Sequence, residues 1–194
     1  MTQLCSDDHI QRITQTLESD PEAGLAALAS ALEAHPEDAR LHFLQGSTLL
    51  GLQRYVSGHD ALSKAVELAP DFAIARFQLG LFQLTSGEVD RALETLGPID
   101  RLPKTHYLRS LVSGLRCLVR DEFDDAIGHL RVGIEQNTEN PPLNRDMEML
   151  ISTISQARSD DAGTAGDGDD PADEGELSEA ALLLSRNRFK PDRH

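Results

Sequence analysis

Seven histidines and two cysteines are the side chains of this sequence that metal binding or nucleophilic catalysis would ordinarily use. No two of the histidines are three or four residues apart, so no single helix would present a histidine pair to a metal ion. Cys5 and Cys117 are far apart, and two such thiols do not make a disulfide framework. The histidines are His9, His35, His42, His59, His106, His129 and His194.

Two further chemical motifs are also missing from the sequence. The Asp-rich stretch 160–173 lacks the terminal Glu and the flanking helices of a calcium-binding loop. No phosphate-binding loop of the GxxxxGK type occurs. The sequence therefore predicts no catalytic residues, no metal site and no cofactor.

The charge of the chain narrows the classes of partner. Among 194 residues, 33 are acidic and 18 basic, which gives a net charge of −15. Such a surface repels nucleic acid and anionic membranes. The first ten residues lack the basic start and apolar run of a secretory signal, and no apolar stretch of about 18 residues predicts a membrane span. We expect a cytoplasmic protein that binds another protein.

A leucine recurs at a fixed interval of 34 residues, and a small residue stands four positions before each one. A fixed period of this length indicates one supersecondary unit that is repeated and stacked. The leucines are Leu28, Leu62, Leu96 and Leu130, and the small residues are Gly24, Gly58, Ala92 and Ala126.

The same register contains a second glycine position, filled by Gly46, Gly80 and Gly114. A glycine inside a helix costs about 1 kcal/mol relative to alanine, so its recurrence indicates close packing of two helices. We expect the leucines to fill the space between one hairpin and the next. Asp20-Pro21 and Asp71 look like helix starts, with Pro21 at the first helical position.

With units near 5–38, 39–72, 73–106 and 107–140, the chain resembles the tetratricopeptide-repeat family over roughly residues 5–140. The resemblance implies an all-α fold, an α-solenoid of antiparallel helix hairpins, with a degenerate first unit. Residues 142–157 predict a C-terminal capping helix that completes a repeat array over 1–158. Its apolar face contains Leu143, Met147, Leu150, Ile151 and Ile154.

The third unit departs from the pattern at Gly97-Pro98, where its second helix should still be running. Proline cannot continue a helix, so we expect an early end and an irregular stretch over 99–104. Two interpretations stay open, a shortened helix or a local change of pitch that shapes the binding groove.

In tetratricopeptide-repeat proteins the first helices of the hairpins line a concave groove, and the resemblance implies the same here. The groove would be apolar and would suit an amphipathic helix or an extended apolar segment of a partner. The alternative for any one of these leucines is the core. The candidate groove residues are Arg40, Phe43, Ser47, Leu50, Ile74, Phe77, Leu81, Leu84, Leu108, Leu111, Leu115 and Leu118. The carboxylate-binding clamp that some members of the family have is absent, because its positions hold Phe43, Ser47, Gln78, Leu108 and Val112.

Two different segments follow the array. Residues 159–176 have eight acids, no base and no large apolar side chain, which predicts a disordered linker. Residues 177–194 predict a short amphipathic basic helix. We consider three roles for it: docking into the protein's own groove, a motif for another protein, or none. The candidate tail motif is Leu177, Leu182, Leu183, Leu184, Arg186, Arg188 and Phe189.

The sequence thus favours a non-enzymatic interaction scaffold or adaptor. The alternative is a dedicated bacterial secretion chaperone of the three-repeat tetratricopeptide type, which the chain resembles in size and charge. An enzyme with an accessory repeat domain is disfavoured, because no stretch outside the repeats is long enough for a catalytic domain.

Overall fold

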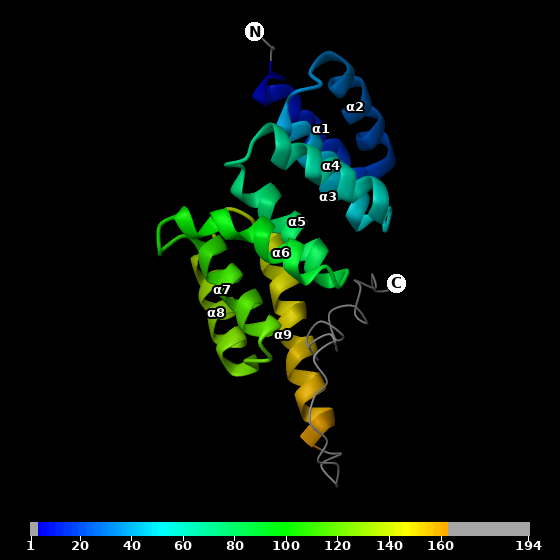
Figure 1. The fold of residues 1–194 in the computed structure, drawn as a ribbon. Helices are drawn as coiled ribbons and strands as arrows, with labels where there is room; N and C mark the ends of the chain where they lie inside the picture. Colours follow the sequence, from blue (N-terminus) through cyan, green and yellow to red (C-terminus); the bar gives the residue numbers. More distant parts are fainter. Residues whose placement is uncertain (1–3, 163–194) are drawn as a thin grey trace. The chain divides into compact units, whose positions relative to one another are not determined.

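The computed structural model describes residues 4–162, and all regular secondary structure in this range is helical (Figure 1). This confirms the expected all-α fold. The helices are α1 (Asp7–Ser19), α2 (Pro21–Ala34), α3 (Ala39–Gly51), α4 (Tyr55–Leu68), α5 (Ala73–Thr85), α6 (Val89–Leu96), the 3-10 helix η1 (Gly97–Arg101), α7 (Tyr107–Val119), α8 (Phe123–Gln136) and α9 (Pro141–Ala162).

The 34-residue period of the sequence sets the helix boundaries. Helices α3, α5, α7 and α9 begin at residues 39, 73, 107 and 141, and the second helices α4, α6 and α8 begin at 55, 89 and 123. Within the α3–α4 pair, Gly46 faces Leu62 while Leu50 faces Gly58, so the two helices run antiparallel. The expected helix hairpins are therefore present.

Glycine and leucine meet at the crossing of each complete hairpin. A Cβ atom on Gly46 would lie 2.7 Å from Leu62 Cγ, and the matching distances are 2.5 Å for Gly80 with Leu96 and 2.8 Å for Gly114 with Leu130. The predicted packing role of the glycines is confirmed. Leu62, Leu96 and Leu130, which we expected between successive hairpins, lie at the helix crossing inside their own hairpin.

Capping side chains mark where several helices begin. Asp20 caps α2 by accepting hydrogen bonds from the backbone N–H groups of Glu22 and Ala23, and Pro21 takes the first helical position, as predicted. The start predicted with Asp71 as the N-cap is wrong by one residue, because α5 begins at Ala73 rather than at residue 72. A turn in which the N–H of Phe72 donates to Ala69 O at 2.9 Å delays α5 to Ala73.

Pro98 ends α6 early, as predicted, because helix α6 stops at Leu96. The expectation of an irregular stretch over 99–104 is wrong for residues 99–101, which belong to the 3-10 helix η1. Proline lacks the N–H that an α-helix needs but fits the first turn of a new helical segment. The tighter turn keeps Ile99 in the core, at 1% exposure.

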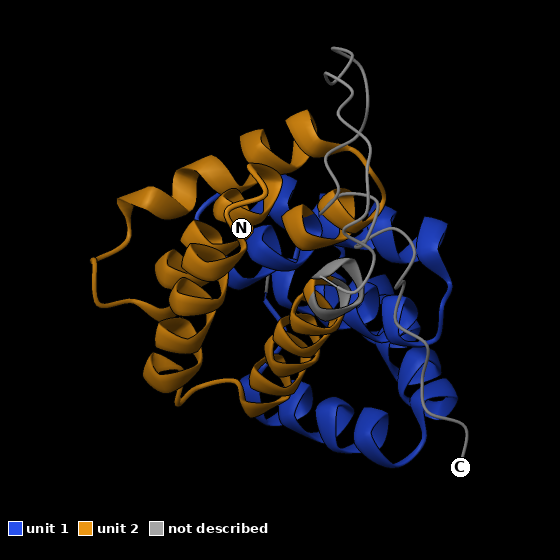
Figure 2. Cartoon of the chain, turned by 90° about the horizontal axis from the view of Figure 1, so that it is seen from below, with its two compact units in different colours: residues 1–79 blue, residues 80–194 orange. Residues whose placement is uncertain are grey.

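The chain divides into two compact units, Met1–Leu79 and Gly80–His194, with the boundary inside α5 (Figure 2). In the first unit α1, α2 and α3 enclose a core cluster made of Cys5, Ile13, Leu28, Ala31 and Leu41. In the second unit α7 and α8 form a hairpin against which α9 packs (Figure 1).

Helix α9 contains the predicted capping helix and is longer than expected at both ends. It begins at Pro141 and runs through Ala162, into the stretch that we assigned to the linker. Leu143, Met147 and Ile154 are buried, and Leu150 and Ile151 are half-buried. The remainder of the linker and the whole tail lie outside the described residues.

Among residues 4–162, no helix has both the length and the apolar character that crossing a membrane requires.

Candidate functional site

Half-buried side chains from α3 and α5 meet in the first unit. The rings of Phe43 and Phe72 lie 5.1 Å apart at an interplanar angle of 57°. One helical turn along α3, the hydroxyl of Ser47 donates a hydrogen bond to Oε1 of Gln78 on α5. Ile74 lies one turn before Gln78 on the same face of α5. We call Phe43, Ser47, Phe72, Ile74 and Gln78 the α3–α5 patch; all five are half-buried.

The patch is preformed rather than loose. The tilted aromatic pair holds both rings by a contact worth about 0.5–1.5 kcal/mol beyond area burial. The Ser47–Gln78 hydrogen bond links the two helices at the next turn. Neither α3 nor α5 contains an acidic residue, although the chain as a whole has a net charge of −15.

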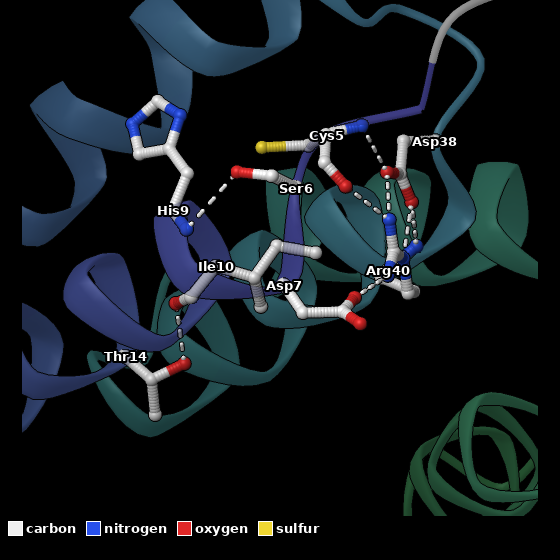
Figure 3. Close-up of polar contacts among 8 residues, drawn as sticks. All are labelled: Cys5, Ser6, Asp7, His9, Ile10, Thr14, Asp38 and Arg40. Atoms are coloured by element: carbon white, nitrogen blue, oxygen red, sulfur yellow. Dashed lines mark hydrogen bonds and ion pairs between the residues drawn. The ribbon is translucent and has the colours of Figure 1, made fainter.

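The side chain of Arg40, a predicted groove residue, forms hydrogen bonds to other residues of the protein (Figure 3). Its guanidinium donates to both carboxylate oxygens of Asp38, at 2.9 and 2.7 Å, to Asp7 at 2.6 Å and to the carbonyl of Cys5 at 2.7 Å. The N–H of Cys5 in turn donates to Asp38 Oδ2 at 3.0 Å. These contacts, which we call the Asp38–Arg40 anchor, hold the N-terminal segment against the start of α3.

The contacts of the anchor shift the pKa values of Asp38 and Arg40. Burial alone would raise the pKa of Asp38, whose side chain is 1% exposed, but hydrogen bonds from Arg40 and Cys5 outweigh burial and hold the pKa below its ordinary value. The hydrogen bonds to Asp38 raise the pKa of Arg40 further above its already high value. The carboxylate is therefore charged in the folded protein, and the anchor acts in structure rather than in ligand binding.

Half of the predicted groove residues are core residues in the structure. Leu111 lies against Gly133 of its own hairpin, where a Cβ on that glycine would come within 2.3 Å of Leu111 Cδ2. Leu50 is half-buried and lies against Gly58, while Leu81 is half-buried in the second unit. The side chains that are at most 1% exposed are Phe77, Leu84, Leu108, Leu111, Leu115 and Leu118.

We expected one periodic set of residues to face a partner, and its members differ in burial. The set is Phe43, Phe77 and Leu111. Phe43 is half-buried, whereas Phe77 and Leu111 are fully enclosed. The predicted tail residues Leu177, Leu182, Leu183, Leu184, Arg186, Arg188 and Phe189 lie outside the described part of the chain.

The thiols are enclosed as well. Cys5 and Cys117 are 3% and 5% exposed, and neither is in a disulfide. Burial, together with a hydrogen bond to Glu122, raises the pKa of Cys117, which opposes formation of a reactive thiolate. In the described range no three His, Cys, Asp or Glu side chains gather as metal ligands would.

The roles of Phe72 and Asp38 were not predicted from the sequence. Phe72 lies in the turn before α5, outside any helix, so helical periodicity could not assign it to the patch. Asp38 stands at the N-cap of α3, and that position was a readable signal for a capping role. Nothing in the sequence indicated its contact with Cys5, 33 residues away.

Comparison with known proteins agrees with the hairpin geometry. The tetratricopeptide-repeat family model matches residues 18–69 and 46–97. The solved structure of MamA, residue 41 to the end, from Desulfovibrio magneticus RS-1 is similar with a TM-score of 0.52. The similarity covers 94% of this chain and 96% of that one at 17% sequence identity, and it shows a shared fold, an α-solenoid of helix hairpins.

Proposed function

Because the chain is a tetratricopeptide-repeat protein, we propose that it is a non-enzymatic interaction module. Its α3–α5 patch binds an apolar or amphipathic segment of another protein. The observation that carries this proposal is the half-exposed Phe43–Phe72 pair, which lies beside the interhelical Ser47–Gln78 hydrogen bond.

The chemistry of the patch favours such a segment. Phe43, Phe72 and Ile74 offer apolar area that a partner could remove from water, at roughly 25 cal/mol per Å². Ser47 and Gln78 offer hydrogen-bonding atoms that would fix the register of the bound segment. Because α3 and α5 have no acidic residue, the patch itself would not repel acidic side chains on the partner.

Position-specific photocrosslinking tests the proposal. A benzophenone amino acid replaces Phe43 in one variant and Ile74 in another, and the proteins are irradiated in the cells that produce them. The controls place the same amino acid at Val56 on α4, 77% exposed, and at Val132 on α8, 43% exposed.

Adducts of the same discrete partner at positions 43 and 74 but not at 56 and 132 would support the proposal. Mass spectrometry then has to locate the crosslink in an apolar or amphipathic segment. Identical adducts at all four positions, or none at 43 and 74, would refute it. A single secreted client at fixed stoichiometry would identify the module as a chaperone for that client.

A further inference from the structure

Helix α9 occupies the place of a first helix, and no second helix follows it within residues 4–162. Pro141 begins α9 34 residues after Tyr107 begins α7, the same step that separates α3, α5 and α7. In each of those three hairpins a second helix starts 16 residues after the first. The position equivalent to that start is residue 157, where α9 continues uninterrupted through Ala162.

Within the described part of the chain, the face of α9 that a second helix would cover is more exposed than the matching face of the other hairpins. Leu49, Gln83 and Cys117, which share one repeat position, are at most 8% exposed, whereas Ile151 at that position of α9 is half-buried. The crossing position of Gly46, Gly80 and Gly114 holds Glu148, which is exposed.

Helix α8 lies beside α9 and fixes which of its side chains are near the beginning of α9. The two helices run antiparallel, because Asn137 and Arg158 mark opposite ends of their contact: Asn137 hydrogen-bonds Asn144 at 2.8 Å, and Arg158 pairs with Asp124. The end of α8 therefore lies beside the beginning of α9.

We propose that residues 177–189 of the same chain pack on α9 as a helix, over Ile151 and Glu148, which lie three residues apart on one face of α9, and complete a fifth hairpin. Leu177, Ala181 and Leu184 share one helical face and would supply the apolar contacts. This docking is separate from the α3–α5 patch and does not depend on the proposed function.

The length of the chain beyond α9 suits this arrangement. The 14 residues 163–176 would span about 19–22 Å as a flexible linker. Helix α9 is about 33 Å long, so the linker lets residue 177 return alongside the end of α9 and run back toward its beginning.

Charge favours α9 over the α3–α5 patch as the docking surface. In the antiparallel direction, the bases Arg186, Arg188 and Lys190 would approach the beginning of α9 and the end of α8. The acidic side chains there are Asp146, Glu148, Glu135 and Glu139, against the two bases Arg145 on α9 and Arg131 on α8. Helices α3 and α5, by contrast, contain Arg40 and Arg76 and no acid.

Hydrogen exchange of the full-length protein tests the docking. With an effective tail concentration of about 1 mM and a dissociation constant of about 0.1 mM, the docked tail would slow exchange over 145–156 about tenfold. Leu184→Asp on the tail and Ile151→Asp on α9 should each remove this protection and leave 39–51 unchanged. Ser178→Asp adds the same charge while keeping a capping oxygen, and it should keep the protection.

Several outcomes would overturn the proposal. Protection that Leu184→Asp leaves intact would exclude the tail as the occupant. Loss of protection at 39–51 and 73–79 instead would place the tail on the α3–α5 patch. Protection that grows as protein concentration rises would show docking between two copies rather than within one chain.

Discussion

Leu130 of α8 lies directly over Gly114 of α7, so close that a Cβ on residue 114 would stand 2.8 Å from Leu130 Cγ and 3.1 Å from the carbonyl oxygen of Ala126. Observed Cβ contacts are essentially never shorter than 3.0 Å, and one of these two neighbours is backbone. The glycine therefore sets how closely the two helices approach.

Gly114→Ala should destabilise the second unit although alanine is the better helix former. The gain of about 1 kcal/mol in helix propensity is outweighed by overpacking, and we expect a net loss of about 1–2 kcal/mol. Gly128→Ala on α8 is the matched control, because a Cβ there meets nothing within 4 Å. It should stabilise by about 0.5–1 kcal/mol. Urea unfolding measures both; equal stabilisation by the two substitutions would contradict the packing role.

Asp38→Ala should release the N-terminal segment. The substitution leaves the backbone N–H of Cys5 and part of the Arg40 guanidinium without their buried acceptor, which should cost about 2–4 kcal/mol. Because Cys5 is tied to Asp38 and Cys117 is not, alkylation of Cys5 should accelerate while that of Cys117 stays slow.

The control for this substitution is Glu22→Ala, which removes the exposed ion pair with Arg54. Exposed pairs contribute about 0–1 kcal/mol, so alkylation of both thiols should stay slow. If Asp38→Ala left Cys5 as protected as it is in the parent protein, the anchor would not hold this segment.

We expect the contribution of the Asp38–Arg40 anchor to the free energy of unfolding to depend on pH. The pKa of Asp38 is lower in the folded protein than in the unfolded chain, so its contribution is fully present above about pH 4, the ordinary carboxyl pKa. The contribution is lost as pH falls through the lower folded value. The stability difference between the parent protein and Asp38→Asn should therefore shrink as pH drops from 4, and urea titrations measure it. A difference that stays constant with pH would argue against a charged Asp38.

Ile74→Glu should reduce the yield of partner adducts at position 43 by about tenfold or more, since burying an unpaired carboxylate in an apolar interface is costly. Val56→Glu on α4, at a site 77% exposed, is the control and should leave the yield unchanged. Both variants are compared at a temperature at which circular dichroism shows them folded. An unchanged yield for Ile74→Glu would remove Ile74 from the binding surface.

The repeat positions were readable from the sequence because helix pairing within a hairpin is local. Gly46 and Leu62 are 16 residues apart, and the same spacing joins Gly80 with Leu96 and Gly114 with Leu130. Pro98 likewise acts on its own helix through its missing N–H. Such features depend on residue type and short spacing, so the sequence by itself determined the hairpins, their boundaries to within a few residues and the early end of α6.

Which repeat positions stay accessible was decided only by the tertiary structure. Phe43, Phe77 and Leu111 have the same place in their units, yet Phe43 meets Phe72 at a half-open surface, while Leu111 is closed in by Gly133. Arg40 looked like a ligand-binding residue until Asp38, Asp7 and Cys5 were placed around it. Burial and charge pairing depend on neighbours that are distant in the sequence and differ from one unit to the next, and a period of 34 residues contains no information about them.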